Sequence, residues 1–180
     1  MGRAQERTRH QIMTAFLDLL EQKYYDMISV SQISEESFVT RSTFYRYFKD
    51  KTALLMTVIE DTVEKTVPDQ PLLTQYVTYV EQYWPLLRHL SPSRQSRADL
   101  HDILNQILWE MIERRVQGSS TVEDPVIDMI RQAKHRNIMI SAVEGIMMGI
   151  LERYVSEGAE NINATELEET VQELVAKFSK

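Results

Sequence analysis

The sequence predicts an all-α protein of about nine helices, in which three short N-terminal helices are joined by a longer helix to a C-terminal helical bundle. Three observations lead to this fold class. Apolar residues recur with helical spacing along almost the whole chain, no segment alternates between apolar and polar residues as a strand would, and caps or prolines separate the periodic segments. With 180 residues, the chain is long enough for one large domain or two small ones.

The N-terminal helices are predicted from their apolar spacing and their caps. In the first helix, expected over residues 6–22, five apolar residues fall on one face: Ile12, Ala15, Phe16, Leu19 and Leu20. Ser29 and Gln32 form a predicted capping box at the start of a second, short helix. Thr40 is expected to cap a third helix, and Asp50 a longer fourth one.

Prolines and further caps divide the C-terminal part of the chain. Pro68 and Pro71 mark an internal boundary after the fourth helix. Asp124 followed by Pro125 indicates a helix start, because proline is favoured at the first helical position. The later helices are expected at 72–84 (continued or kinked at Pro85), at 94–117, from 125 onward, at 138–156 after a cap at Asn137, and at 165–178 after a capping box at Thr165.

The composition is that of an ordinary globular protein, with 43% apolar and 26% charged residues. The sequence contains no cysteine, which excludes disulfides, thiolate metal ligands and a cysteine nucleophile. No apolar run near the N-terminus could serve as a secretory signal, and the longest apolar stretch, around Ile138–Leu151, is too short to span a bilayer. We therefore expect a soluble, cytoplasmic protein.

The charge is distributed unevenly along the chain. The formal net charge is −7, which by itself argues against a nucleic-acid partner. Residues 1–55, however, hold eight Lys/Arg and seven Asp/Glu, a balance of +1, whereas the remainder holds twelve and twenty, a balance of −8. An acidic C-terminal part repels DNA, so any contact with DNA would be confined to the N-terminal part.

The segment Thr40–Lys51 has the composition of a helix that enters a groove of DNA. Short polar side chains at its start can reach base edges or phosphates, and its cations can neutralise the DNA backbone. Phe44 and Phe48 are expected to anchor the helix to its own domain. The alternative is a capped amphipathic helix in an all-α core, but an ordinary surface helix has no reason to be this short and this aromatic.

The pattern over Ile12–Leu55 resembles the TetR family of transcriptional regulators. The resemblance rests on Ile12-x-x-Ala15-Phe16-x-x-Leu19-Leu20, on Val30-x-x-Ile33, and on Arg41-Ser42-Thr43-Phe44-Tyr45-Arg46-Tyr47-Phe48-Lys49-Asp50-Lys51. It implies a helix-turn-helix DNA-binding domain over residues 1–50 and a helical ligand-binding and dimerisation domain over residues 51–180. The C-terminal body varies too widely within the family for residue roles to be carried over.

The resemblance places the recognition helix at about Thr40–Tyr47, in the major groove. Arg41 and Ser42 are expected to read base edges, because arginine is suited to a bidentate contact with guanine. Lys51 is expected to add a positive charge for a phosphate at a helix N-terminus. The full set of expected DNA-binding residues is Ser29, Ser31, Thr40, Arg41, Ser42, Thr43, Tyr45, Arg46, Tyr47 and Lys51.

Two positions depart from the family pattern. Phe38 stands in the turn, where the family usually has glycine. If the turn keeps a positive φ there, a bulky residue costs roughly 1–2 kcal/mol of strain, whereas a rearranged turn would change the angle between the two helices. Tyr47 stands where histidine is common in the family, and it keeps a hydroxyl donor.

The C-terminal part contains two sets of candidate site residues. Small residues recur on the helix after Asn137 and favour a two-fold dimer seam, with tight packing inside one subunit as the alternative; the expected dimer face is Ser141, Gly145, Met148 and Gly149. Aromatic residues and methionines at helical spacing either line a ligand pocket or form plain core; the candidate pocket residues are Tyr76, Tyr79, Tyr83, Trp84, Trp109, Met111 and Met129.

The expected function follows from the helix-turn-helix. The sequence has no nucleophile elbow, phosphate-binding loop, zinc-protease motif or dinucleotide fingerprint, so we expect no enzyme activity, no cofactor and no metal site. We expect a homodimeric repressor that binds a pseudo-palindromic operator in double-stranded DNA and is released by a small-molecule or protein effector bound in the body. The alternative is a protein-interaction adaptor that keeps the fold and is controlled by a partner protein.

Overall fold

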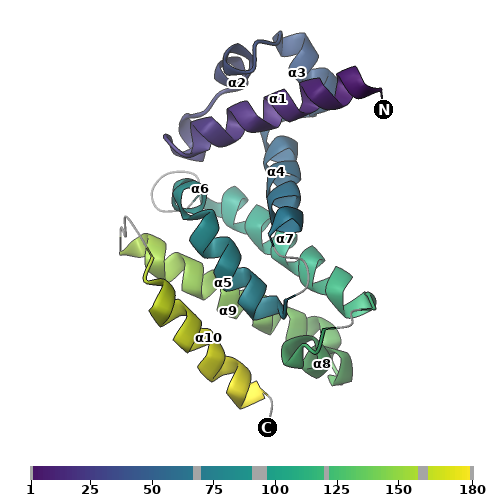
Figure 1. Ribbon diagram of the computed structural model, residues 1–180, viewed down its shortest axis with the longest axis vertical. Helices are drawn as coiled ribbons and strands as arrows, with labels where there is room; N and C mark the ends of the chain where they lie inside the picture. The colour runs from purple at the N-terminus through teal and green to yellow at the C-terminus, as the bar shows by residue number, and fades with distance from the viewer. Residues whose placement is uncertain (1, 67–69, 91–96, 120–121, 158–161, 179–180) are drawn as a thin grey trace. The chain divides into compact units, whose positions relative to one another are not determined.

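The computed structural model describes residues 2–66, 70–90, 97–119, 122–157 and 162–178, and Figure 1 shows its helices. Over these ranges the chain forms ten α-helices, one 3-10 turn and no strand, so the predicted all-α class is confirmed. The elements are α1 (Arg3–Leu20), η1 (Tyr25–Met27), α2 (Val30–Glu36), α3 (Arg41–Tyr47), α4 (Lys51–Lys65), α5 (Leu72–Gln82), α6 (Trp84–Leu90), α7 (Arg97–Gln117), α8 (Pro125–Gln132), α9 (Arg136–Ser156) and α10 (Ala164–Phe178).

The chain divides into two compact units. The head unit comprises Met1–Val63 and Pro85–Ser91, and the body unit comprises Glu64–Trp84 and Pro92–Lys180. The expected division at residue 50 between a DNA-binding domain and a ligand-binding and dimerisation domain stays a prediction. Most of α4 belongs to the head unit, and its apolar residues Leu54, Leu55 and Val58 are fully buried.

Aromatic and aliphatic side chains of the first three helices form the core of the head unit. Ile12, Phe16 and Leu20 on one face of α1 are fully buried, as the helical spacing predicts. Phe44 of α3 is also fully buried and Phe48 is 4% exposed, which confirms that both anchor the third helix. α1 packs against α2, and α2 packs against α3. The head therefore holds α3 by its aromatic side and leaves the other side exposed.

A short helix around Pro85 also belongs to the head unit. The sequence left open whether the fifth helix continues or kinks there; the structure ends α5 at Gln82 and starts a separate helix, α6, at Trp84. Proline is tolerated in a first helical turn, since its missing N–H has no intrahelical partner there. His89 of α6 lies with Nδ1 2.7 Å from the carbonyl oxygen of Leu20. The extra helix accounts for ten helices instead of nine.

Most predicted caps are confirmed. Four side chains accept a hydrogen bond from a backbone N–H in the first turn of their helix: Ser29, Thr40, Asp50 and Asp124. Two caps were wrong. α9 begins at Arg136, before Asn137, and α10 begins at Ala164, before Thr165. The N–H of Glu166 lies 3.3 Å from the side-chain oxygen of Asn163, which takes the place of the expected threonine.

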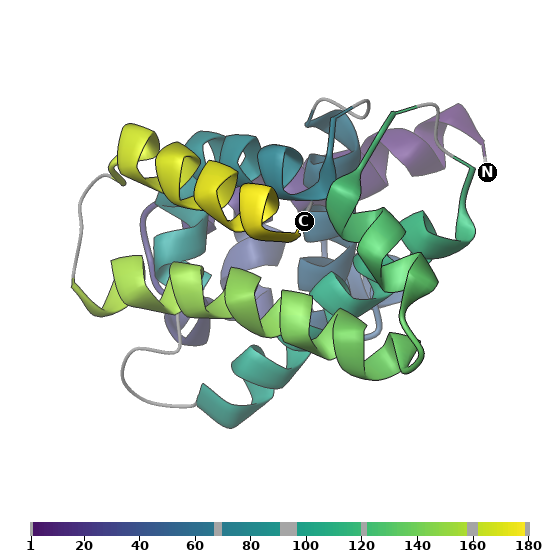
Figure 2. The same cartoon turned by 90° about the horizontal axis from the view of Figure 1, so that it is seen from below.

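The body unit is a layered arrangement of the remaining long helices. α7 packs against α8 and α9, and α10 packs against α5 and α8. Figures 1 and 2 show α10 lying along α5 and α9 lying along α7. None of the described helices combines the length and the hydrophobicity that crossing a lipid bilayer requires.

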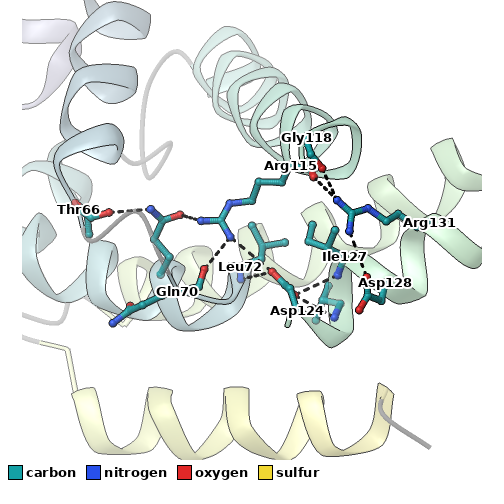
Figure 3. A network of polar contacts seen from close by, with 11 residues as sticks. Thr66, Gln70, Leu72, Arg115, Gly118, Asp124, Ile127, Asp128 and Arg131 are labelled. Atoms are coloured by element: carbon teal, nitrogen blue, oxygen red, sulfur yellow. Dashed lines mark hydrogen bonds and ion pairs between the residues drawn. The ribbon is translucent and has the colours of Figure 1, made fainter. Parts of the chain in front are cut away.

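A buried aspartate joins three helices of the body unit (Figure 3). One carboxylate oxygen of Asp124 caps α8 by accepting from the N–H groups of Val126 and Ile127, each at 3.2 Å. Its other oxygen accepts from the N–H of Leu72 at 2.7 Å, at the start of α5. That oxygen also lies 3.6 Å from Nη1 of Arg115 on α7. The starts of α5 and α8 are thus held to α7 by one side chain.

The guanidinium of Arg115 extends this network toward the segment before α5. It donates to the backbone carbonyl of Gln70 at 3.0 Å and to the side-chain oxygen of Gln75. Gln75 in turn donates to the carbonyl of Thr66 at 2.8 Å. Burial lowers the pKa of Arg115, and the negative charge of Asp124 opposes that shift. The network thus pairs the buried carboxylate of Asp124 and the side chain of Gln75 with hydrogen-bond partners, as buried polar groups require.

Candidate nucleic-acid interface

The turn between α2 and α3 is built on a left-handed residue. The N–H of Phe38 donates to the carbonyl of Glu35 at 3.1 Å, and the N–H of Val39 donates to the carbonyl of Ser34 at 2.9 Å. This pair of bonds is the Schellman ending of a helix, which requires positive φ at the residue after the C-cap. Phe38 adopts φ 55°. The turn has therefore kept its glycine-type conformation without glycine.

α3 presents one exposed and one buried face. Thr40 caps the helix by accepting from the N–H of Thr43 at 3.1 Å, which fixes the direction in which the helix starts. Exposed side chains then follow at positions one helical turn apart, whereas Phe44 points into the core. The exposed face consists of Arg41, Ser42, Tyr45 and Arg46. It offers two guanidinium groups and two hydroxyl groups on a single surface.

The serine and threonine residues of the expected DNA-binding set differ in exposure and in the hydrogen bonds that their hydroxyl groups make. The hydroxyl of Ser29 donates to the side-chain oxygen of Gln32 at 3.0 Å, so it is used inside the capping box. Ser31 is exposed on α2. Thr43 is half-buried, and its hydroxyl lies 3.0 Å from that of Thr40. The structure thus brings Ser29, Ser31 and Thr40 to the helix starts, where backbone N–H groups favour an anion.

Tyr47 lies at the margin of this surface. Its side chain is half-buried, and the guanidinium carbon of Arg46 is 5.3 Å from the centre of its ring. This contact is within the range of a cation–π interaction.

Lys51 makes several contacts inside the head unit. Its ammonium donates to the carbonyl oxygens of Tyr25 and Ile28, both at 2.7 Å, and lies 3.9 Å from the centre of the Tyr25 ring. Burial lowers the pKa of this ammonium. Two of its three N–H groups are therefore used within the head unit, and the phosphate contact expected from the sequence stays a prediction. Residue spacing offers no signal for partners that lie 26 and 23 positions away in the chain.

The candidate pocket residues lie on α5 to α8, with Tyr83 between α5 and α6. Tyr76, Tyr79 and Trp84 are buried, and four others are half-buried: Tyr83, Trp109, Met111 and Met129. The hydroxyl of Tyr76 donates to the carbonyl of Met147 on α9 at 2.6 Å, and burial raises the pKa of this phenol. Tyr76 is thus joined to the core of the body unit. That these residues line a ligand pocket stays a prediction.

The expected dimer face is partly exposed. Ser141, Gly145 and Gly149 lie on the exposed side of α9, together with Ile138, which is 71% exposed. Met148 does not belong to this side, because its side chain is 4% exposed and packs inside the subunit. The correction follows from helical geometry, since neighbouring residues point about 100° apart. Within the described ranges, no group of three or more His, Asp or Glu side chains is placed to hold a metal ion.

The sequence match to known proteins is concentrated in the head. Residues 12–58 match the family model of bacterial regulatory proteins of the tetR family. The HTH-type dhaKLM operon transcriptional activator DhaS of Lactococcus lactis subsp. lactis (strain IL1403) is 31% identical over 87 residues, which are 48% of this chain and 45% of that protein. The matched part is therefore less than half the length of this curated relative.

The structural match extends over the whole fold. The dihydroxyacetone kinase operon activator DhaS superposes with a TM-score of 0.58 at 16% sequence identity and covers 94% of each chain. NalD, the secondary repressor of the MexAB-OprM multidrug efflux pump in Pseudomonas aeruginosa, superposes with a TM-score of 0.58 at 17% identity and covers 98% of each chain. At these identities the solved structures show the fold, and the match to the tetR family model is confined to residues 12–58 of the head.

Proposed function

Residues 12–58 of this chain match the family model of bacterial regulatory proteins of the tetR family, and on that premise we propose that the protein is a homodimeric, DNA-binding transcriptional regulator. The observation that supports this function most directly is the exposed face of α3. Arg41 and Ser42 lie in the first turn of a helix whose opposite side is fixed by Phe44. An arginine at this place can donate two hydrogen bonds to O6 and N7 of guanine in the major groove.

Binding to a pseudo-palindromic operator requires two heads. A two-fold dimer supplies them, with each recognition helix in one half-site. The exposed small residues of α9 support this part of the proposal, because small side chains let two helices approach closely. An added Cβ at Gly145 or Gly149 would meet no neighbouring group within 4 Å, so this side of the helix is open in the single subunit.

We propose that the protein represses transcription and does not activate it. Among the similar proteins, DhaS is named an activator and NalD a repressor, so their names do not select one sign. Repression needs only occupation of an operator that overlaps a promoter, whereas activation needs a further productive contact with the transcription machinery. An effector bound in the body would release the operator if it stabilised a conformation with lower affinity for DNA. We propose no catalytic activity, and the DNA partner implies a cytoplasmic location.

The experiment that tests this function is selection of bound sequences from a random pool of DNA duplexes at near-physiological salt, followed by titration of the selected duplex. We expect a palindromic sequence that is bound by two copies of the chain. Enrichment of no sequence by a folded protein would overturn the regulator function and favour the adaptor. The sign is then read by transcription in vitro from a promoter that overlaps the selected operator: a fall in transcript supports repression, and a rise assigns activation.

A further inference from the structure

The aromatic side chain of Phe38 is not buried by any contact within the subunit. It is 96% exposed, and it has the only positive φ among the described residues other than glycine, 55°. A side chain in this left-handed region costs free energy relative to glycine, because its Cβ approaches the following carbonyl oxygen. Burial of the ring would offset that cost, but the ring stays in water. An observed outlier of this kind points to a contact outside the chain.

The position of Phe38 relates this contact to DNA. It precedes Thr40, the cap of α3, by two residues, and Arg41 and Ser42 follow in the first exposed turn. The Schellman bonds at the end of α2 fix the backbone on both sides of Phe38. Its ring therefore projects from a rigid turn that leads directly into the proposed reading surface.

We propose that Phe38 contacts the 5-methyl group of a thymine next to the bases read by Arg41 and Ser42. This inference rests on the proposed function. A phenyl ring has no hydrogen-bond donor or acceptor, so it selects the apolar group that a base pair presents in the major groove, and only thymine carries one there. The contact adds preference for thymine at that operator position. It neutralises no phosphate, so it does not contribute to the salt dependence of binding.

Two substitutions separate the ring from the backbone strain. Phe38→Gly removes both the ring and the strain, whereas Phe38→Ala removes the ring and keeps a Cβ at positive φ. We expect Phe38→Gly to raise the melting temperature and Phe38→Ala to leave it nearly unchanged. Both are expected to weaken binding to the selected operator about tenfold, with the same slope of log affinity against log salt as the natural protein. Operator binding equal to that of the natural protein by both variants would overturn the contact.

Deoxyuridine scanning identifies the DNA partner. Each thymine of the selected operator is replaced in turn by deoxyuridine, which removes only the methyl group. We expect one position in each half-site where this change weakens binding by the natural protein and has no effect on Phe38→Ala. Equal effects on both proteins at every position would overturn the assignment to thymine. If the natural protein selects no operator, that result contradicts the regulator function itself. The selection is carried out before any variant is made, so the two failures can be told apart.

Discussion

The ammonium of Lys51 in α4 lies 2.7 Å from the carbonyl oxygen of Tyr25 and 3.9 Å from the centre of the same residue's ring. One cation thus binds both the backbone and the aromatic face of a residue 26 positions earlier. Its second carbonyl partner, Ile28, directly precedes the α2 cap Ser29. Lys51 therefore links α4 to the start of α2. Ser29 and Ser31 are exposed at this start.

Replacing Lys51 should destabilise the head rather than remove a phosphate contact. The Lys51→Met variant keeps an apolar side chain of similar length but removes the charged donor from two carbonyl groups. We therefore expect the free energy of unfolding to fall by about 2 kcal/mol. The measurement is urea denaturation. At temperatures where the variant is folded, the slope of log affinity against log salt for operator DNA should stay the same. A slope reduced by about 1 would instead restore the phosphate contact expected from the sequence.

Arg41→Ala should reduce discrimination between sequences. Loss of a bidentate contact with guanine is expected to lower the preference for the operator over random DNA by about 1–3 kcal/mol. Lys49→Ala is the matched control, since Lys49 is an exposed cation just beyond α3. Its loss should weaken binding to both DNAs to the same extent. Equal weakening of both DNAs by Arg41→Ala would contradict its role in base reading.

Asp124→Ala should strongly destabilise the body. The substitution removes the cap of α8, the acceptor for Leu72 and the charge next to Arg115. Loss of one partner of a buried ion pair, together with a cap, is expected to cost about 3–5 kcal/mol of unfolding free energy. Asp128→Ala serves as the control, because that carboxylate makes only an exposed pair with Arg131 and should change stability by less than about 0.5 kcal/mol. Similar losses in the two variants would contradict the network.

Tyr76 should make the body sensitive to alkali. Burial raises the pKa of its phenol above the usual 10.0, so the unfolded chain loses this proton first as the pH rises. The stabilising contribution is present below pH 10 and is lost above it, by up to about 1.4 kcal/mol per pH unit. Tyr76→Phe lacks the proton and should show a shallower fall in melting temperature between pH 9 and pH 11. Burial also raises the pKa of Tyr25, but this residue is present in both proteins, so its contribution cancels when the two are compared.

Gly145→Arg should produce a folded monomer. The open space around this position in the subunit leaves room for a side chain, while a charged side chain on both sides of a two-fold seam would prevent close approach. The measurement is sedimentation of the variant, with Gln106→Arg on the exposed side of α7 as control. The control should remain dimeric. A dimeric Gly145→Arg would move the dimer interface away from this face of α9.

Local patterns of residues predicted much of the head. Apolar spacing placed α1, and the capping residues Ser29 and Thr40 marked the starts of α2 and α3. Phe44 was predicted to be core and is fully buried. These predictions are confirmed because the start of a helix and its cap depend on residues within four positions of each other. Asn137 shows the limit of this local reasoning, since α9 starts before it, at Arg136, and has no side-chain cap.

Short-range spacing in the sequence predicted the fold class, the position of α3 and the resemblance of the head to the tetR family. Which side chains remain available to a partner depends on the tertiary structure. It directed Lys51 inward to Tyr25, buried Met148, and left Phe38 exposed at φ 55°. These outcomes depend on contacts between residues far apart in the chain, or on the absence of such contacts. Burial and hydrogen bonding are properties of the packed molecule, so they follow only once all its helices are in place.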